Sequence, residues 1–172
     1  GVPTQNRLSR LKQQLESGQL SLAWEARWGY LRSLLQALDI NVDSQLLVHS
    51  KTSLQSESIN AARPRAIYFN DDTHVAFVQG SPLLELTSLD AALGPVFFVM
   101  DNRREAGVKL AREGGGCLSC HDNFSMTGGG VPRILVMSAP VDDPRATRTF
   151  SSASDVDDRT PIAQRWGGWY VT

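Results

Sequence analysis

Two thiols and an imidazole stand together in the segment Cys117-Leu118-Ser119-Cys120-His121. In a helix, Cys117 and Cys120 would lie about one turn apart, so both sulfur atoms would reach the same side. This C-x-x-C-H spacing is the one that attaches a c-type haem: two thiols bond to the porphyrin vinyl groups, and the histidine binds the iron. Because the chain has only two Cys and three His in 172 residues, chance is a weak explanation for the motif.

Three other interpretations of the cysteine pair stay open: a redox-active dithiol, half of a zinc site, or an ordinary structural disulfide. Structural zinc takes four ligands, and the remaining histidines, His49 and His74, lie far upstream without a paired metal-ligand spacing. A redox dithiol is expected at the start of a helix after a strand, whereas three glycines precede Cys117. Dithiol chemistry also has no need of His121, so we predict haem attachment.

The chain resembles the c-type cytochromes through these five residues and their surroundings. Three further segments, 50–55 (SKTSLQ), 64–71 (PRAIYFND) and 165–172 (RWGGWYVT), are similar to those of a group of larger bacterial haem c proteins of unsettled activity. The similarity covers residues from about 45 to the end, and this chain resembles the front part of such a protein. It implies one covalent haem c, redox partner proteins, and a periplasmic or otherwise extracytoplasmic location.

Length and charge favour one globular domain over residues 1–172, with a helical segment at 1–40 and a mixed haem-binding core at 45–172. A net charge of −1 and 20% charged residues give no indication of a nucleic-acid partner. No apolar window is long enough to cross a bilayer, and no secretory signal begins at Gly1. We therefore expect a mature or trimmed form, with membrane contact only through a removed anchor.

Two helices are predicted in the first 40 residues. Leu8, Leu11 and Leu15 recur at helical spacing before a Ser17-Gly18 stop, which predicts a helix over about 4–17. A second helix is predicted from Ser21. Its broad apolar stripe is expected to pack in the core, with a partner helix or a membrane surface as the alternative. The stripe consists of Trp24, Trp28, Leu31, Leu34, Leu35 and Leu38.

Short runs of β-branched and aromatic residues then predict a small antiparallel sheet. The predicted strands are 46–49, 66–70, 75–79 and 96–100. A turn at 70–73 predicts a hairpin that brings Tyr68 and Phe69 beside Ala76 and Phe77.

A further helix is predicted over 101–113, with Asp101 or Asn102 as N-cap and Gly114 at its end. The predicted fold class is therefore α+β: N-terminal helices, a small antiparallel sheet and a late haem-binding loop or helix. The alternative is a PAS-like sensor fold, by analogy alone. Two glycine runs, 114–116 and 128–130, flank the motif and are expected to let the backbone approach the porphyrin closely, or else to form a flexible linker.

The ligand on the other side of the iron is the open question. His74 and Met137 rank level as distal candidates, and His49 is a further histidine that would give two-histidine ligation. Too few residues separate Met126 from His121 for Met126 to reach the opposite face of the porphyrin ring. Met100 is more typical of a core residue. A vacant sixth position is equally compatible with the sequence.

Haem propionates need cationic partners, and guanidinium groups match carboxylates with paired hydrogen bonds. Arg65 and Arg133 flank predicted strands and are our predicted cofactor-binding cations, with Arg63 as a further candidate. Trp166 and Trp169 are expected either to cover the haem edge or to complete the core.

These features predict a monohaem c-type cytochrome acting in electron transfer, more an electron carrier than an enzyme. The alternative is a haem-based sensor or a peroxidase-like enzyme with an open or displaceable distal site. Peroxide chemistry would need an acid or base near the iron, and His74 beside Asp71 and Asp72 is the nearest such cluster.

Overall fold

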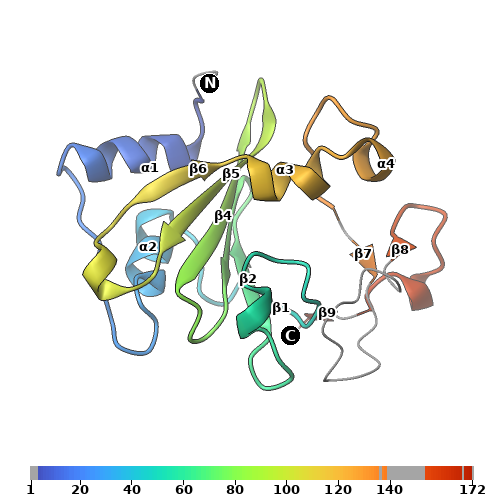
Figure 1. The fold of residues 1–172 in the computed structure, drawn as a ribbon, viewed down its shortest axis with the longest axis horizontal. Helices are drawn as coiled ribbons and strands as arrows, with labels where there is room; N and C mark the ends of the chain where they lie inside the picture. The colour runs from blue at the N-terminus through green and yellow to red at the C-terminus, as the bar shows by residue number, and fades with distance from the viewer. Residues whose placement is uncertain (1–3, 136, 139–153, 168, 172) are drawn as a thin grey trace.

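The computed structural model describes residues 4–135, 137–138, 154–167 and 169–171. A seven-stranded sheet has two helices on one face and the segment with the cysteines on the other (Figure 1). Its strands are β1 (Leu46–Val48), β2 (Arg65–Phe69), β3 (Thr73–Phe77), β4 (Leu83–Asp90), β5 (Gly94–Asp101), β6 (Leu110–Glu113) and β9 (Trp169–Val171). The helices are α1 (Arg7–Glu16), α2 (Leu31–Ala37), α3 (Gly115–His121) and α4 (Phe124–Thr127). The predicted α+β fold class is confirmed.

Neighbouring strands of this sheet are antiparallel, in the order β6-β5-β4-β3-β2-β1-β9. The first six strands therefore form a meander in chain order, with β9 beside β1. A second, two-stranded sheet joins β7 (Met137–Ser138) to β8 (Ser154–Asp155). The PAS-like alternative remains an analogy. None of the helices in the described part of the chain is long and apolar enough to cross a membrane.

Helix α1 confirms the first predicted helix within a few residues at each end. The side chain of Asn6 caps it by accepting a hydrogen bond of 2.9 Å from the Ser9 N–H. Ser17 is the C-cap of the helix. Gly18 follows it with a φ of +73°, a conformation that suits a residue without a Cβ. Leu8 and Leu11 point into the core, and each fully buried leucine contributes about 1.5–3 kcal/mol to stability.

Helix α2 begins at Leu31, so the prediction of a helix from Ser21 is wrong in its first ten residues. Asn102 explains the difference, because its side-chain oxygen accepts a hydrogen bond of 2.9 Å from the Tyr30 N–H and its carbonyl accepts one of 3.0 Å from the Trp24 indole. Gly29 turns the chain there at a φ of +59°. A Cβ on Gly29 would lie 2.1 Å from the Asn102 side-chain oxygen. The predicted core role of the apolar stripe is confirmed.

The core lies between α1, α2 and one face of the sheet. Strand alternation sends Leu84, Leu86, Phe98 and Met100 toward the helices. The residues between them, among them Glu85, Phe97 and Val99, face the opposite side, which α3 approaches. This second face carries the candidate site.

Two predictions for the region of the sheet need correction. The predicted helix over 101–113 is wrong: a short 3-10 turn at Arg104–Ala106 and Gly107, with a φ of +67°, lead into β6, which pairs with β5. Pairing to β5 satisfies the backbone groups of this segment and buries Leu110, and this outweighs its helical pattern. Strand β4 was not predicted: its burial alternates, but Ser88 and Asp90 occupy buried positions and Leu89 an exposed one, which weakens the alternating pattern of the sequence.

The predicted β2–β3 hairpin exists, but its register differs from the prediction. Tyr68 pairs with Val75 and Phe69 with His74, rather than with Ala76 and Phe77. The turn is tighter than the predicted register required, because the Asn70 N–H donates to the Thr73 carbonyl at 3.0 Å. This register places His74 on the second face, where the Phe69 and His74 rings stack with centroids 6.3 Å apart.

Candidate haem attachment site

Helix α3 carries Cys117, Cys120 and His121 on two turns. It follows β6 after Gly114, and the Glu113 carboxylate accepts a hydrogen bond of 2.8 Å from the Gly116 N–H at its start. Gly116 lies against Leu54, whose Cδ2 is 3.1 Å from the place a Cβ would take, so the glycine permits this close approach. Both cysteines are free thiols and half-buried.

The His121 imidazole is fixed on two sides. Its Nδ1 lies 2.7 Å from the Arg133 carbonyl oxygen, and the ring lies against Phe97 with centroids 4.5 Å apart. A carbonyl oxygen only accepts, so Nδ1 carries a proton, and in the neutral imidazole Nε2 then keeps its lone pair. A hydrogen bond from the second ring nitrogen to a backbone carbonyl is the usual way in which metal-binding histidines are oriented.

Burial lowers the pKa of His121 from its ordinary value. The Arg133 carbonyl acts in the opposite direction, the charge of Arg65 lowers the pKa further, and the charge of Glu85 raises it. The net direction is downward, which favours the neutral imidazole at neutral pH. Neutral imidazole is the form that binds metal ions.

The Cys117 thiol has its pKa raised to about 12, chiefly by burial, with contributions from the charges of Glu85 and Glu113 and from Cys120. Redox-active C-x-x-C cysteines show the opposite shift, because their chemistry requires a thiolate near neutral pH. The environment of Cys117 therefore gives no support to the redox-dithiol alternative. Among the described residues, no group of three or more His, Cys, Asp or Glu side chains lies close enough together to hold a metal ion. The structure therefore gives no support to the zinc alternative within this part of the chain.

Below the motif, Arg65 and Glu85 form a largely buried ion pair, with Nη1 and Oε2 3.9 Å apart and side chains 13% and 17% exposed. The loop at 53–55 closes over this pair. Glu85 accepts hydrogen bonds from the Ser53 hydroxyl, from the Leu54 N–H at 3.1 Å and from the Gln55 amide at 2.9 Å. Burial lowers the pKa of Arg65, and the charge of Glu85 partly offsets this effect.

Arg65 has one guanidinium donor without a hydrogen-bond partner. Its Nη1 donates to the Thr52 carbonyl at 3.2 Å, but its Nε is buried without a hydrogen-bond partner. An orphaned guanidinium donor within the electrostatic reach of His121 is compatible with the predicted propionate role. Arg133 reaches the site through its backbone, while its side chain is exposed, and Arg63 is exposed as well. The predicted side-chain roles of Arg133 and Arg63 remain predictions.

Apolar side chains near the motif are exposed to an unusual degree. Phe124 is 83% exposed and Val131 57%, with Leu54 and Ile134 slightly under half exposed. Leu54 touches α3, Phe124 follows it directly, and Val131 and Ile134 flank the residue bonded to His121. A porphyrin is a large apolar plate that would cover such a surface, so these residues fit the predicted cofactor.

The structure separates the candidates for the distal ligand. Met100 is 1% exposed in the core between the sheet and the helices, on the opposite face from Phe97, which excludes it. The backbone of Met126 belongs to α4, but its side chain lies outside the described residues. Met137 lies in β7, and its carbonyl accepts a hydrogen bond of 2.9 Å from the Trp169 indole. His49 follows β1 directly and is half-buried.

His74 lies in β3 on the same face as Phe97. Burial lowers the pKa of His74, with an opposing effect from the charge of Asp72, and its Nδ1 is buried without a hydrogen-bond partner. Asp72 itself is bound by the Arg7 guanidinium at 3.1 Å and by the Thr73 hydroxyl at 2.7 Å. The carboxylate is thus held by other groups and does not position His74.

The two tryptophans near the C-terminus lie edge to face, with centroids 6.5 Å apart. Trp169 pairs with Val48 at the edge of the sheet, whereas Trp166 is 51% exposed. Whether they cover a haem edge or complete the core remains a prediction.

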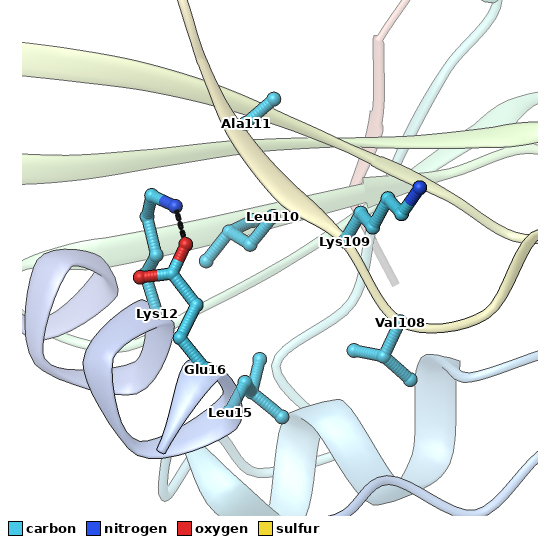
Figure 2. Close-up of a pocket in the computed structure, with 7 residues that line it drawn as sticks. All are labelled: Lys12, Leu15, Glu16, Val108, Lys109, Leu110 and Ala111. Atoms are coloured by element: carbon cyan, nitrogen blue, oxygen red, sulfur yellow. Dashed lines mark hydrogen bonds and ion pairs between the residues drawn. The ribbon is translucent and has the colours of Figure 1, made fainter. Parts of the chain in front are cut away.

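A shallow pocket lies away from the motif, between α1 and β6 (Figure 2). Lys12 and Glu16, which form an ion pair, line it together with the apolar side chains of Leu15, Val108 and Leu110. None of the C-x-x-C-H residues lines it.

Several site residues were missed by the sequence analysis: Glu85, Phe97, Glu113 and the backbone of Arg133. Glu85 leaves only a weak signal, because a charge between Leu84 and Leu86 is the ordinary pattern of a strand with one buried face. The carbonyl of Arg133 leaves no signal, since every residue has one. No protein-family model, curated protein or solved structure matches this chain, so the site stands on its own residues and geometry.

Proposed function

We propose that this protein binds one haem c covalently through Cys117 and Cys120, with His121 as the proximal iron ligand, and that it carries electrons outside the cytoplasm. The observation that supports the proposal best is the His121 ring, whose Nδ1 is held 2.7 Å from the Arg133 carbonyl, which leaves Nε2 as the nitrogen that would bind iron. Two free thiols stand on the same short helix.

The chain's own residues have separate tasks in this proposal. His121 binds the iron, the Arg133 carbonyl fixes the tautomer and direction of the imidazole, and the Arg65 Nε–H is a donor for a haem carboxylate. Glu85 compensates the buried charge of Arg65. When bound, the haem supplies the one-electron iron couple that electron transfer requires.

Electron transfer is preferred over peroxide chemistry because of the position of Asp72. A distal histidine needs a positioned partner to act as acid or base, and the Asp72 carboxylate is held by Arg7 and Thr73 instead. Redox partner proteins would then be met through small, transient interfaces.

The test is expression with and without haem c maturation machinery, followed by a pyridine haemochrome spectrum and spectra of the reduced protein with and without carbon monoxide. Wild type is expected to give a c-type haemochrome only with the machinery, and the reduced bands should not respond to carbon monoxide. The double variant Cys117→Ala/Cys120→Ala should lose covalent haem, whereas the matched control Ser119→Ala on the same helix should keep it. Absence of haem in wild type would overturn the proposal, and rapid carbon monoxide binding or peroxide turnover would favour the sensor or peroxidase alternative.

A further inference from the structure

We propose that His74 is the second axial ligand of the iron, so that the haem stands over the sheet between the imidazoles of His121 and His74. This inference rests on the proposed function and extends it to the other side of the cofactor. It also separates His74 from Met137, which the sequence ranks level.

The first observation is the cross-strand register. His74 in β3 pairs with Thr87 in β4, and Thr87 pairs with Phe97 in β5. Residues directly opposite one another in antiparallel strands point to the same face of the sheet. His74, Thr87 and Phe97 therefore form one row on one face, and the His121 ring rests against Phe97 at the end of that row.

The second observation is the spacing along this row. Two neighbouring-strand steps of about 4.8 Å each place the backbones of His74 and Phe97 about 10 Å apart. The residue between them is Thr87, whose side chain is small. Metal–imidazole bonds are about 2 Å long, so the two ligating nitrogens would lie about 4 Å apart, one on each side of the flat ring. The remaining separation between the two backbones would be taken up by the imidazole side chains.

The third observation is that apolar side chains next to this row are incompletely covered. Phe69, which pairs with His74, is 37% exposed, and Leu89, two residues after Thr87 on the same face, is 43% exposed. A porphyrin standing over Thr87 would cover apolar side chains that the described residues leave open to water.

The fourth observation concerns the His74 ring itself. Its Nδ1 is buried and has no hydrogen-bond partner, which is uncommon and calls for an explanation. Phe69 stacks on the ring, with centroids 6.3 Å apart, so packing fixes the ring on this side. Because Nδ1 is buried, Nε2 is the nitrogen with which His74 would bind the iron in this proposal.

The experiment compares the haem-loaded wild type with His74→Ala, and with His49→Ala as the matched control histidine. Wild type is expected to be low-spin, with the near-infrared and electron paramagnetic resonance signals of two imidazole ligands. His74→Ala should keep its covalent haem, become high-spin, bind carbon monoxide, and return to low-spin when imidazole is added. His49→Ala should match wild type, and rescue by imidazole would not follow from a merely structural role of His74.

A second variant keeps the inference testable if His74→Ala does not fold. His74→Met offers a thioether at the same place and should move the near-infrared band to the position of histidine–methionine ligation. Two results would overturn this inference and leave the proposed function standing. The first is covalent haem with an unchanged spectrum in His74→Ala. The second is a wild-type spectrum of histidine–methionine ligation that is lost in Met137→Leu. Absence of haem c in wild type would instead overturn the proposed function.

Discussion

His121 and Arg133 hold each other through two hydrogen bonds, although twelve residues separate them in the chain. The His121 Nδ1 donates to the Arg133 carbonyl at 2.7 Å, and the Arg133 N–H donates to the His121 carbonyl at 2.9 Å. The intervening chain turns through Gly128, Gly129 and Gly130, each at a φ of about +70° to +82°. The backbone of Arg133 therefore orients the candidate iron ligand.

This pairing predicts different effects for two substitutions of Arg133. Arg133→Ala keeps the carbonyl and the N–H, so haem content and the low-spin spectrum should be unchanged. Arg133→Pro removes the N–H, and loss of this hydrogen bond should weaken the loop by about 1 kcal/mol and lower haem content. Haem content after expression with maturation machinery measures both, and a loss of haem in Arg133→Ala would show that the side chain is needed.

Removal of the Glu85 carboxylate should destabilise the protein strongly. Glu85→Ala leaves the Arg65 guanidinium buried without a counter-charge and removes the acceptor of three hydrogen bonds from the loop at 53–55. The expected loss in the free energy of unfolding is about 3–5 kcal/mol, measured by urea denaturation of the haem-free protein.

The control for this prediction is the exposed pair of Glu25 and Arg32, whose charged atoms are 3.7 Å apart. Glu25→Ala should cost less than about 1 kcal/mol, because solvent screens the pair. Equal losses in Glu85→Ala and Glu25→Ala would contradict the assigned role of the buried pair.

The Cys117 thiol should react slowly with alkylating reagents in the haem-free protein. Its pKa is raised to about 12, so only a very small thiolate fraction exists at pH 8, and thiolate is the reactive form. In a Cys120→Ser variant, which leaves Cys117 as the only thiol, the iodoacetamide rate should be far below that of free cysteine and should rise steeply above pH 10.

Glu113→Gln gives a matched test of the charge contribution. Glutamine keeps an oxygen that can accept the Gly116 hydrogen bond but removes the negative charge that raises the pKa of Cys117. Alkylation of Cys117 should become faster in this variant. If Cys117 in the Cys120→Ser variant, with Glu113 unchanged, reacted as fast as free cysteine, the buried environment described for this thiol would be wrong.

Stability of the haem-free protein should fall on mild acidification. Burial lowers the pKa of both His74 and His121 below the unfolded value of about 6.5, so the unfolded chain takes up these protons first. The stability from the two neutral imidazoles is fully present above pH 6.5 and is lost as the pH falls through their folded pKa values. Urea denaturation at pH 7.5 and at stepwise lower pH, kept above the range where carboxylates titrate, measures the loss.

A His74→Gln/His121→Gln double variant provides the comparison for this pH dependence. It lacks both titrating groups, so its free energy of unfolding should vary less with pH in the same window. An identical slope in wild type and in the double variant would assign the pH dependence to other groups.

The sequence by itself determined the spacing of the C-x-x-C-H residues, the first helix and several strands of the sheet. The C-x-x-C-H spacing needs only local chain geometry, and α1 follows from its leucine spacing, its Asn6 cap and its glycine stop. Strands β2, β3 and β5 follow from runs of β-branched and aromatic residues, and their existence, though not the register of the hairpin, was predictable.

Only the tertiary structure decided what surrounds the motif. The local sequence pattern of residues 101–113 predicts a helix. In the structure Leu110–Glu113 instead forms a strand, because its backbone groups pair with those of β5. The second helix starts ten residues late because Asn102, more than 70 residues away, holds Tyr30 and Trp24. The Arg133 carbonyl, the Arg65–Glu85 pair and the row from His74 to Phe97 likewise depend on contacts between distant segments. Local propensities act over a few residues, whereas register and long-range hydrogen bonds are fixed only when the whole sheet forms.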